Sequence, residues 1–143
     1  MYSPNGLGAD ELAGRQRARE AQTIKPFVGW FEITGKDGPA LQRFYSKLFG
    51  WSINDAGEDS GYGLVEAGEK GIAGGIGASQ DGAQGGVTFY VEVDDPAAFL
   101  ERAEKLGGKT VVPPTKIPGF GLTFAFFADP DGHVVGLSRG AVQ

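Results

Sequence analysis

The chain has 143 residues, of which 41% are hydrophobic and 22% charged, so it is long enough for one ordinary domain with a buried core. Its formal net charge of -5 argues against nucleic acid as a partner and mildly favours cationic ligands. Because the chain contains no cysteine, disulfide bonds, thiol nucleophiles and cysteine zinc sites are excluded.

Residues 1–26 are predicted to form an N-terminal arm that is partly helical or flexible. Between Tyr2 and Ile24 its only large apolar residues are Leu7 and Leu12, which are too few to bury a helical face. The arm lacks the continuous apolar segment of a signal peptide, and no stretch of the chain is apolar enough to span a bilayer. We therefore expect a cytoplasmic protein without a membrane partner.

The first strong strand signal runs over residues 27–33. Successive side chains of a strand point to opposite faces. One face therefore carries Phe27, Phe31 and Ile33, and the other carries Val28, Trp30 and Glu32. Both faces hold bulky side chains, which predicts that both are covered.

An amphipathic helix is predicted next, with Pro39 near its first position and Gly50 at its end. Its apolar residues recur at intervals of three and four: Leu41, Phe44, Tyr45, Leu48 and Phe49. Shorter strands are expected at residues 51–54, 61–67 and 71–76, followed by a flexible connector at 78–86.

The second half repeats this order. Its first strand has Val87, Phe89, Val91 and Val93 on one face and Thr88, Tyr90 and Glu92 on the other. A helix should begin at Asp95-Pro96 and end at Gly107, followed by a strand at 109–112 and a proline-rich loop. A hairpin with strands at 122–128 and 134–138, turning at 129–132, closes the unit.

Superposing the halves with a shift of about 60 residues places Phe31-Glu32-Ile33 over Val91-Glu92-Val93. Self-similarity at a fixed offset determines the fold and has to be recognised before local motifs are interpreted. A duplicated unit also creates a cleft between its halves, and we expect the functional site there.

Three segments resemble the vicinal oxygen chelate superfamily, which includes glyoxalase I, bleomycin-resistance proteins, fosfomycin-resistance enzymes and extradiol dioxygenases. These segments are residues 30–33, 44–51 and 129–137, and the resemblance covers Phe27 to Arg139. It implies an α+β fold in a single domain, 27–143. In that fold two βαβββ modules, 27–78 and 87–139, form a curled mixed sheet around a central cleft, with the helices on the outer face. It also implies a homodimer.

Enzymes of this superfamily usually hold a divalent metal at four strand positions. By the resemblance these positions fall on Val28, Thr88, Gly136 and a residue near Ala73. Valine, threonine and glycine offer no imidazole or carboxylate, so we expect no metal and no cofactor. The only histidine, His133, lies in a predicted turn, and turns are normally solvated.

If Val28 and Thr88 point into the cleft, alternation places further strand residues there as well. The candidate ligand-binding residues are Val28, Trp30, Glu32, Thr88, Tyr90, Glu92, Phe120 and Ser138. In this interpretation Trp30 and Tyr90 sandwich a planar ligand, Glu32 and Glu92 supply acceptors or counter-charge, and Phe120 with Ile117 caps the mouth. Alternatively, the aromatic rings pack on each other or on a dimer partner, and the carboxylates are solvated.

The favoured function is a metal-independent small-molecule binding protein, resembling the drug-sequestering branch of the superfamily. Its ligand would be a planar, apolar or cationic metabolite or antibiotic, and no residue would be catalytic. A second hypothesis is a metal-free isomerase, cyclase or lyase with Glu32 or Glu92 as general base. A third is a metal-dependent enzyme with nonstandard ligands, including Glu32, Glu92 or His133, and a fourth is a protein interaction module.

Overall fold

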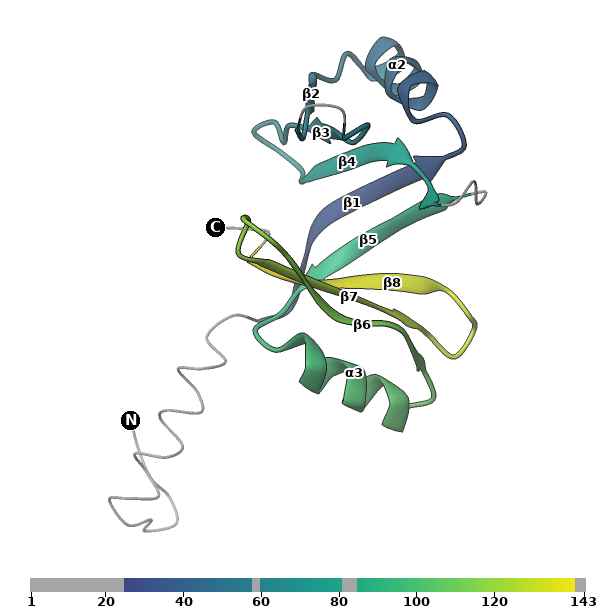
Figure 1. Ribbon diagram of the computed structural model, residues 1–143, viewed down its shortest axis with the longest axis vertical. Coiled ribbons are helices and arrows are strands. Elements are labelled where there is room, and N and C mark those ends of the chain that lie inside the picture. The colour runs from purple at the N-terminus through teal and green to yellow at the C-terminus, as the bar shows by residue number, and fades with distance from the viewer. Residues whose placement is uncertain (1–24, 58–59, 81–84, 141–143) are drawn as a thin grey trace, which may run out of the picture.

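The computed structural model describes residues 25–57, 60–80 and 85–140 (Figure 1). The elements are β1 (Phe27–Gly35), α2 (Gly38–Phe49), β2 (Ile53–Asp55), β3 (Gly63–Val65), β4 (Ala73–Ala78), β5 (Gly86–Glu92), α3 (Pro96–Lys105), β6 (Lys109–Ile117), β7 (Leu122–Ala128) and β8 (Val134–Arg139). The expected N-terminal arm lies outside the described residues except for Lys25 and Pro26. Neither helix of the described part is long and apolar enough to cross a membrane.

All eight strands form one sheet in the order β2-β3-β4-β1-β5-β8-β7-β6. The pairs β1–β4 and β5–β8 are parallel and the other neighbours are antiparallel, so the sheet is mixed. Each βαβββ module supplies four strands, and the modules join at β1 and β5. In Figure 1 the curled sheet is open, with α2 beside the upper module and α3 beside the lower one. The predicted α+β fold is confirmed.

Matching caps start the two helices. Asp37 precedes α2, and its carboxylate accepts a hydrogen bond from the Ala40 amide at 3.0 Å. Asp95 precedes α3 and accepts from the Ala98 amide at 3.2 Å. In both helices a proline occupies the first turn, where its missing N–H costs nothing. The helix α2 then ends at Gly50, whose φ of 72° is a left-handed conformation that glycine adopts readily.

These caps fix the offset of the repeat at 58 residues, the separation of Asp37 and Asp95. Glu32, five residues before the first cap, therefore corresponds to Tyr90, five residues before the second. The superposition made from the sequence, which placed Glu32 over Glu92, is two residues out. The faces assigned to Trp30 and Glu32 are unaffected, because a shift of two preserves the alternation of a strand. The expected position of Val28 on that face is wrong, because the bulge between Val28 and Trp30 pairs Val28 with Val91, which faces the α3-side core.

Each helix covers one side of its own module. On the α2 side the buried core is Ile33, Val65 and Ile76, with Phe31, Leu41, Tyr45, Trp51 and Ile53 packed around it. On the α3 side it is Val93, Leu100, Ala125 and Leu137, with Val91, Phe99 and Phe127. Since neighbouring residues of a strand alternate, Glu32 and Tyr90 point to the opposite face, which neither helix covers.

Candidate functional site

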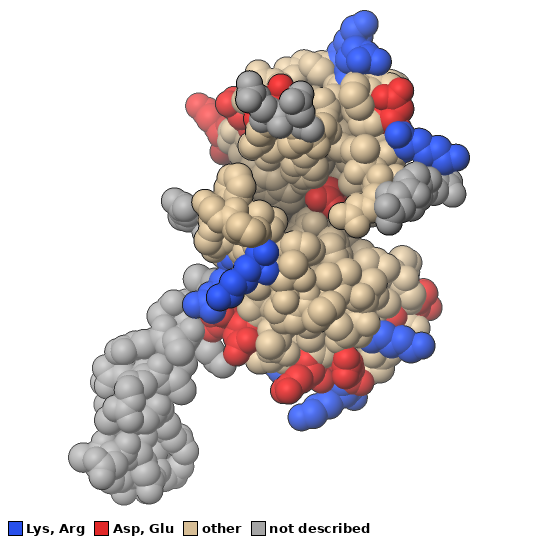
Figure 2. Space-filling model, viewed as in Figure 1, with Lys and Arg blue, Asp and Glu red and all other residues tan. Residues whose placement is uncertain are grey.

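The helix-free face of the sheet is hollowed between the two modules. Figure 2 shows this hollow, with an acidic side chain visible at its floor and mostly uncharged surface around it. The strands that meet there are β1 and β5, the two central strands of the sheet. Residues of both modules of a single chain therefore build the floor.

Four side chains form a hydrogen-bonded network on this face. The Tyr62 hydroxyl donates to Glu32 Oε2 at 2.9 Å, and the Tyr90 hydroxyl lies 3.2 Å from both Glu32 oxygens. The indole Nε1–H of Trp30 donates to the Tyr62 hydroxyl oxygen at 3.1 Å. The central group is the Glu32 carboxylate, which two phenols from different modules hold in place.

Two glycines make room for the tyrosine rings. Gly75 on β4 is the register partner of Glu32, and Gly136 on β8 is that of Tyr90. A Cβ atom on Gly75 would lie 1.8 Å from the hydroxyl oxygen of Tyr62, and one on Gly136 would lie 2.4 Å from the ring of Tyr90. Both distances are far below contact distance, so the network requires glycine at these equivalent positions.

Burial raises the pKa of both Tyr62 and Tyr90 well above the ordinary value of a phenol, and the negative charge of Glu32 raises each pKa further. Both hydroxyls therefore stay protonated and donate to the carboxylate. The Oε2 atom of Glu32 accepts a hydrogen bond from each phenol, whereas Oε1 accepts one from Tyr90 only. A carboxylate has about four acceptor positions, so Oε1 retains capacity for a donor on a ligand.

An aromatic wall continues the site on β7. The ring centroids of Tyr90 and Phe126 lie 5.3 Å apart, and those of Phe126 and Phe124 lie 5.9 Å apart. Ala125 between them belongs to the α3-side core, so both phenylalanines point to the helix-free face. The hollow is thus lined by aromatic rings around one carboxylate.

Sequence reasoning had assigned no role to Tyr62, Phe124 or Phe126. The available signal was alternation around a core residue: Gly63 is buried against α2, so the preceding Tyr62 faces the other way. That signal becomes usable only when the core face of β3 and β7 is known.

Of the predicted ligand-binding residues, the structure brings Trp30, Glu32 and Tyr90 together. Thr88 is the register partner of Glu32, but its hydroxyl donates to the carbonyl oxygen of Val134 at 2.7 Å. It therefore lies beside the network without being part of it.

Glu92 and Ser138 form a separate pair farther along the strands. Glu92 is 4% exposed and accepts from the Ser138 hydroxyl at 2.9 Å and from the Gly140 amide at 2.7 Å. Both carboxylate oxygens are thus engaged by the protein itself. This carboxylate ties the end of β5 to the end of β8.

The other predicted residues lie away from the network. Val28 is 44% exposed, and the register of β1 against β5 shifts just after it, so Val28 does not share the face of Trp30. Phe120 is 70% exposed in the turn between β6 and β7. His133 lies exposed in its turn, with Nδ1 3.1 Å from a carboxylate oxygen of Asp129.

The repeat also defines the four positions at which the superfamily resemblance implied metal ligands. The sequence had placed two of them at Val28 and near Ala73, and both placements are two residues out: Thr88, seven residues before its helix cap, corresponds to Trp30, and Gly136 corresponds to Gly75. An indole only donates, the Thr88 hydroxyl is already bonded, and the tyrosine rings fill the space at both glycines. In the described part of the chain no three His, Cys, Asp or Glu residues cluster as metal ligands would. These residues do not fit a divalent metal.

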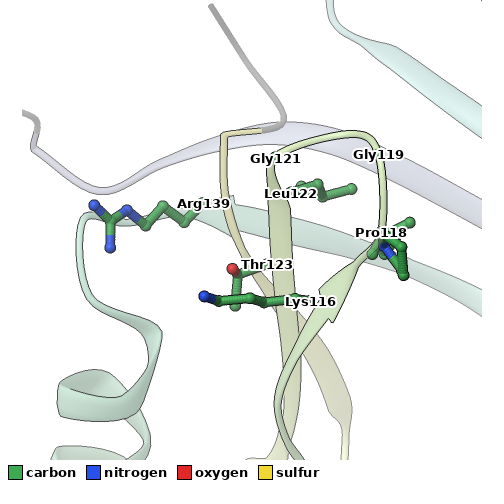
Figure 3. A pocket seen from close by; sticks show the side chains of 8 residues that line it. Lys116, Pro118, Gly119, Gly121, Leu122, Thr123 and Arg139 are labelled. Atoms are coloured by element: carbon green, nitrogen blue, oxygen red, sulfur yellow. The ribbon is translucent and has the colours of Figure 1, made fainter.

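Two open cavities lie elsewhere. One, of about 400 Å³, is mainly apolar and lies between α3 and the sheet. The other, of about 480 Å³, lies at the β6–β7 hairpin (Figure 3). Neither is lined by Glu32 or its partners, so the position of the candidate site follows from the hydrogen-bond network and the hollow, not from these cavities.

The chain was compared with protein-family profiles and with curated protein sequences. The profile of the Glyoxalase/Bleomycin resistance protein/Dioxygenase superfamily matches residues 27–137. No curated protein sequence matches the chain closely enough to count as a relative.

Solved structures with the same fold share little sequence with the chain. A superfamily member from Vibrio splendidus 12B01 has a TM-score of 0.58 at 15% identity, covering 80% of this chain and 99% of its own. A methylmalonyl-CoA epimerase from Mycobacterium tuberculosis has a TM-score of 0.58 at 16% identity, covering 80% and 87%. The Mn(II)-bound glyoxalase from Novosphingobium aromaticivorans also has a TM-score of 0.58, at 14% identity, covering 79% and 37%. At these identities the likeness concerns the fold alone.

Proposed function

Because the chain belongs to the Glyoxalase/Bleomycin resistance protein/Dioxygenase superfamily, we propose that it is a metal-independent protein that binds a small molecule in the helix-free hollow around Glu32. The observation that carries this proposal is the carboxylate itself, which two protonated phenols position while one oxygen keeps acceptor capacity. An N–H donor or a positive charge on a ligand would bind to the free acceptor position of Glu32 Oε1.

The surroundings favour a flat ligand. Trp30, Tyr90, Phe124 and Phe126 present rings to the hollow, and aromatic faces attract both planar apolar groups and cations. Small-molecule sites typically combine such an apolar lining with a few fixed polar groups. The expected ligand class is therefore a planar, apolar or cationic metabolite or antibiotic, bound without chemical change.

Equilibrium dialysis against matched planar probes tests this proposal. The cation 1-methylquinolinium should bind saturably, and the anion quinoline-2-carboxylate should bind at least tenfold more weakly because Glu32 repels it. The Glu32→Gln variant should lose most of this preference. Glu101→Gln serves as the control, since Glu101 is exposed on α3 and makes no side-chain hydrogen bond with a described residue. Equal binding of both probes to the wild-type protein would refute the charge assignment.

A metal-free isomerase, cyclase or lyase is the second candidate, with Glu32 as general base. It is favoured by the phenols beside the carboxylate: once Glu32 has taken a proton from a ligand, it attracts their hydrogens less, and they can be donated to the ligand oxygen that has become negative. Mass analysis of candidate ligands after incubation separates the two functions. If the wild-type protein converts a ligand into a product and the Glu32→Gln variant does not, the protein is an enzyme and the simple binding function is refuted.

A further inference from the structure

Three polar side chains form a row across the end of the second module. Lys116 on β6 is the register partner of Thr123 on β7, and Thr123 is the partner of Arg139 on β8. Register partners on neighbouring strands share a face, with Cβ atoms about 5 Å apart. Figure 3 shows the side chains of Lys116 and Arg139 extending to the same side, with Thr123 between them.

None of these three side chains has a partner in the described part of the chain. Neither the Lys116 ammonium nor the Arg139 guanidinium makes an ion pair or a hydrogen bond with the described residues. The Thr123 hydroxyl makes no hydrogen bond with them either. The row therefore offers two positive charges and one hydroxyl to whatever occupies the space beside it.

The cavity of about 480 Å³ at the β6–β7 hairpin is lined by this row together with residues of the hairpin turn. Ile117 and Leu122 follow Lys116 and precede Thr123 along their strands, so their side chains point to the other face of the hairpin, as Figure 3 shows for Leu122. Gly119 and Gly121 have φ values of 86° and 62°, which glycine adopts without strain, and they add no side chain that would close the opening. The volume exceeds that of a simple inorganic anion and suits an organic molecule.

We propose that the hairpin cavity is a binding site for a small organic anion, with its phosphate or carboxylate group on Lys116, Thr123 and Arg139. A guanidinium presents a planar fork that matches two oxygens of such a group, and the ammonium adds a point charge. The protein as a whole carries a net charge of -5, so attraction of an anion has to come from this local pair. The site does not depend on the ligand proposed for the Glu32 hollow.

Titration calorimetry with phenyl phosphate at low salt tests this site. The wild-type protein should bind one equivalent, and Lys116→Gln and Arg139→Gln should each weaken binding about tenfold or more because a charge-assisted hydrogen bond is lost. Lys109→Gln is the matched control: Lys109 is an exposed lysine at the start of the same strand, and its removal should change little.

Further measurements separate the charged row from the rest of the surface. Leu122→Ala should leave phenyl phosphate binding unchanged, because the Leu122 side chain points to the other face of the hairpin. Glu32→Gln should leave phenyl phosphate binding unchanged, since the two sites share no residue. The proposal is overturned if phenyl phosphate does not saturate the protein, if Lys109→Gln weakens binding as much as Arg139→Gln, or if Glu32→Gln abolishes it.

Discussion

Glu32 and Tyr90 occupy the same place in the two halves of the repeat, and they are hydrogen bonded to each other with the Tyr90 hydroxyl 3.2 Å from both carboxylate oxygens. A duplicated unit would begin with identical residues at these positions. Here one copy carries the acceptor and the other the donor, which joins the modules on the helix-free face where β1 meets β5. The most polar contact of the hollow is thus also a contact between the modules.

Removing either phenol should destabilise the fold. Tyr62→Phe or Tyr90→Phe leaves the half-buried Glu32 carboxylate with one donor fewer, a loss of about 1–3 kcal/mol in the free energy of unfolding. Urea unfolding measures this loss. Tyr45→Phe should cost much less, because the Tyr45 hydroxyl bonds to no described residue. Equal losses at all three tyrosines would show that the network adds nothing beyond packing.

Stability should fall at high pH. The pKa of Tyr62 and of Tyr90 is raised in the native state by burial and by Glu32. From about pH 10 upwards the unfolded chain releases both protons while the native state keeps them, so each phenol lowers the unfolding free energy by up to about 1.4 kcal/mol per pH unit. Unfolding curves between about pH 9 and pH 11.5 measure the slope. The double variant Tyr62→Phe, Tyr90→Phe should have a shallower slope, and an unchanged one would contradict the assignment.

A methyl group at either supporting glycine should disrupt the network. Gly75→Ala and Gly136→Ala place a Cβ atom against Tyr62 and Tyr90 respectively, and overpacking of this kind costs about 1–3 kcal/mol. Thermal unfolding measures the effect. Gly86→Ala is the control, because nothing lies within 4 Å of its Cβ position. If Gly75→Ala were as stable as Gly86→Ala, the Tyr62 ring would have to occupy another position.

Divalent metals should not stabilise the protein. Trp30, Gly75, Thr88 and Gly136 stand where ligands would be needed, and a metal raises the melting temperature only if it binds the native state more tightly than the unfolded one. Adding Ni²⁺, Mn²⁺, Fe²⁺ or Zn²⁺ should leave the melting temperature of chelator-treated protein unchanged. A stoichiometric metal that raises this temperature would restore the metal-dependent alternative.

Local chemistry made much of the fold predictable. Asp95-Pro96 predicted the start of α3, and Gly50 predicted the end of α2, because capping and left-handed glycine depend on only a few neighbouring residues. The order of strands and helices followed from the duplication and from the family resemblance. The alternation of β1 correctly placed Trp30 and Glu32 on one face, opposite Phe31 and Ile33.

The features of the fold and of the site that the sequence did not predict depend on tertiary packing. Periodicity grouped five apolar residues on α2, but only Leu41 and Tyr45 pack on the core, and Phe44, Leu48 and Phe49 are 56–57% exposed. An apolar stripe shows which side of a helix faces the core, but it does not show how many of its residues the sheet covers. The role of Tyr62 was equally hidden, because its partner Glu32 lies 30 residues away and only the fold brings the two together.

The most direct test of the proposed site uses the two tryptophans of the chain, Trp30 and Trp51. Trp30 donates its indole N–H within the network, whereas Trp51 packs in the α2-side core on the opposite face. In ¹⁵N–¹H spectra recorded during titration with 1-methylquinolinium, the Trp30 indole resonance should shift saturably and that of Trp51 should stay in place. Binding that moves Trp51 alone, or neither indole, would contradict a ligand site at Glu32.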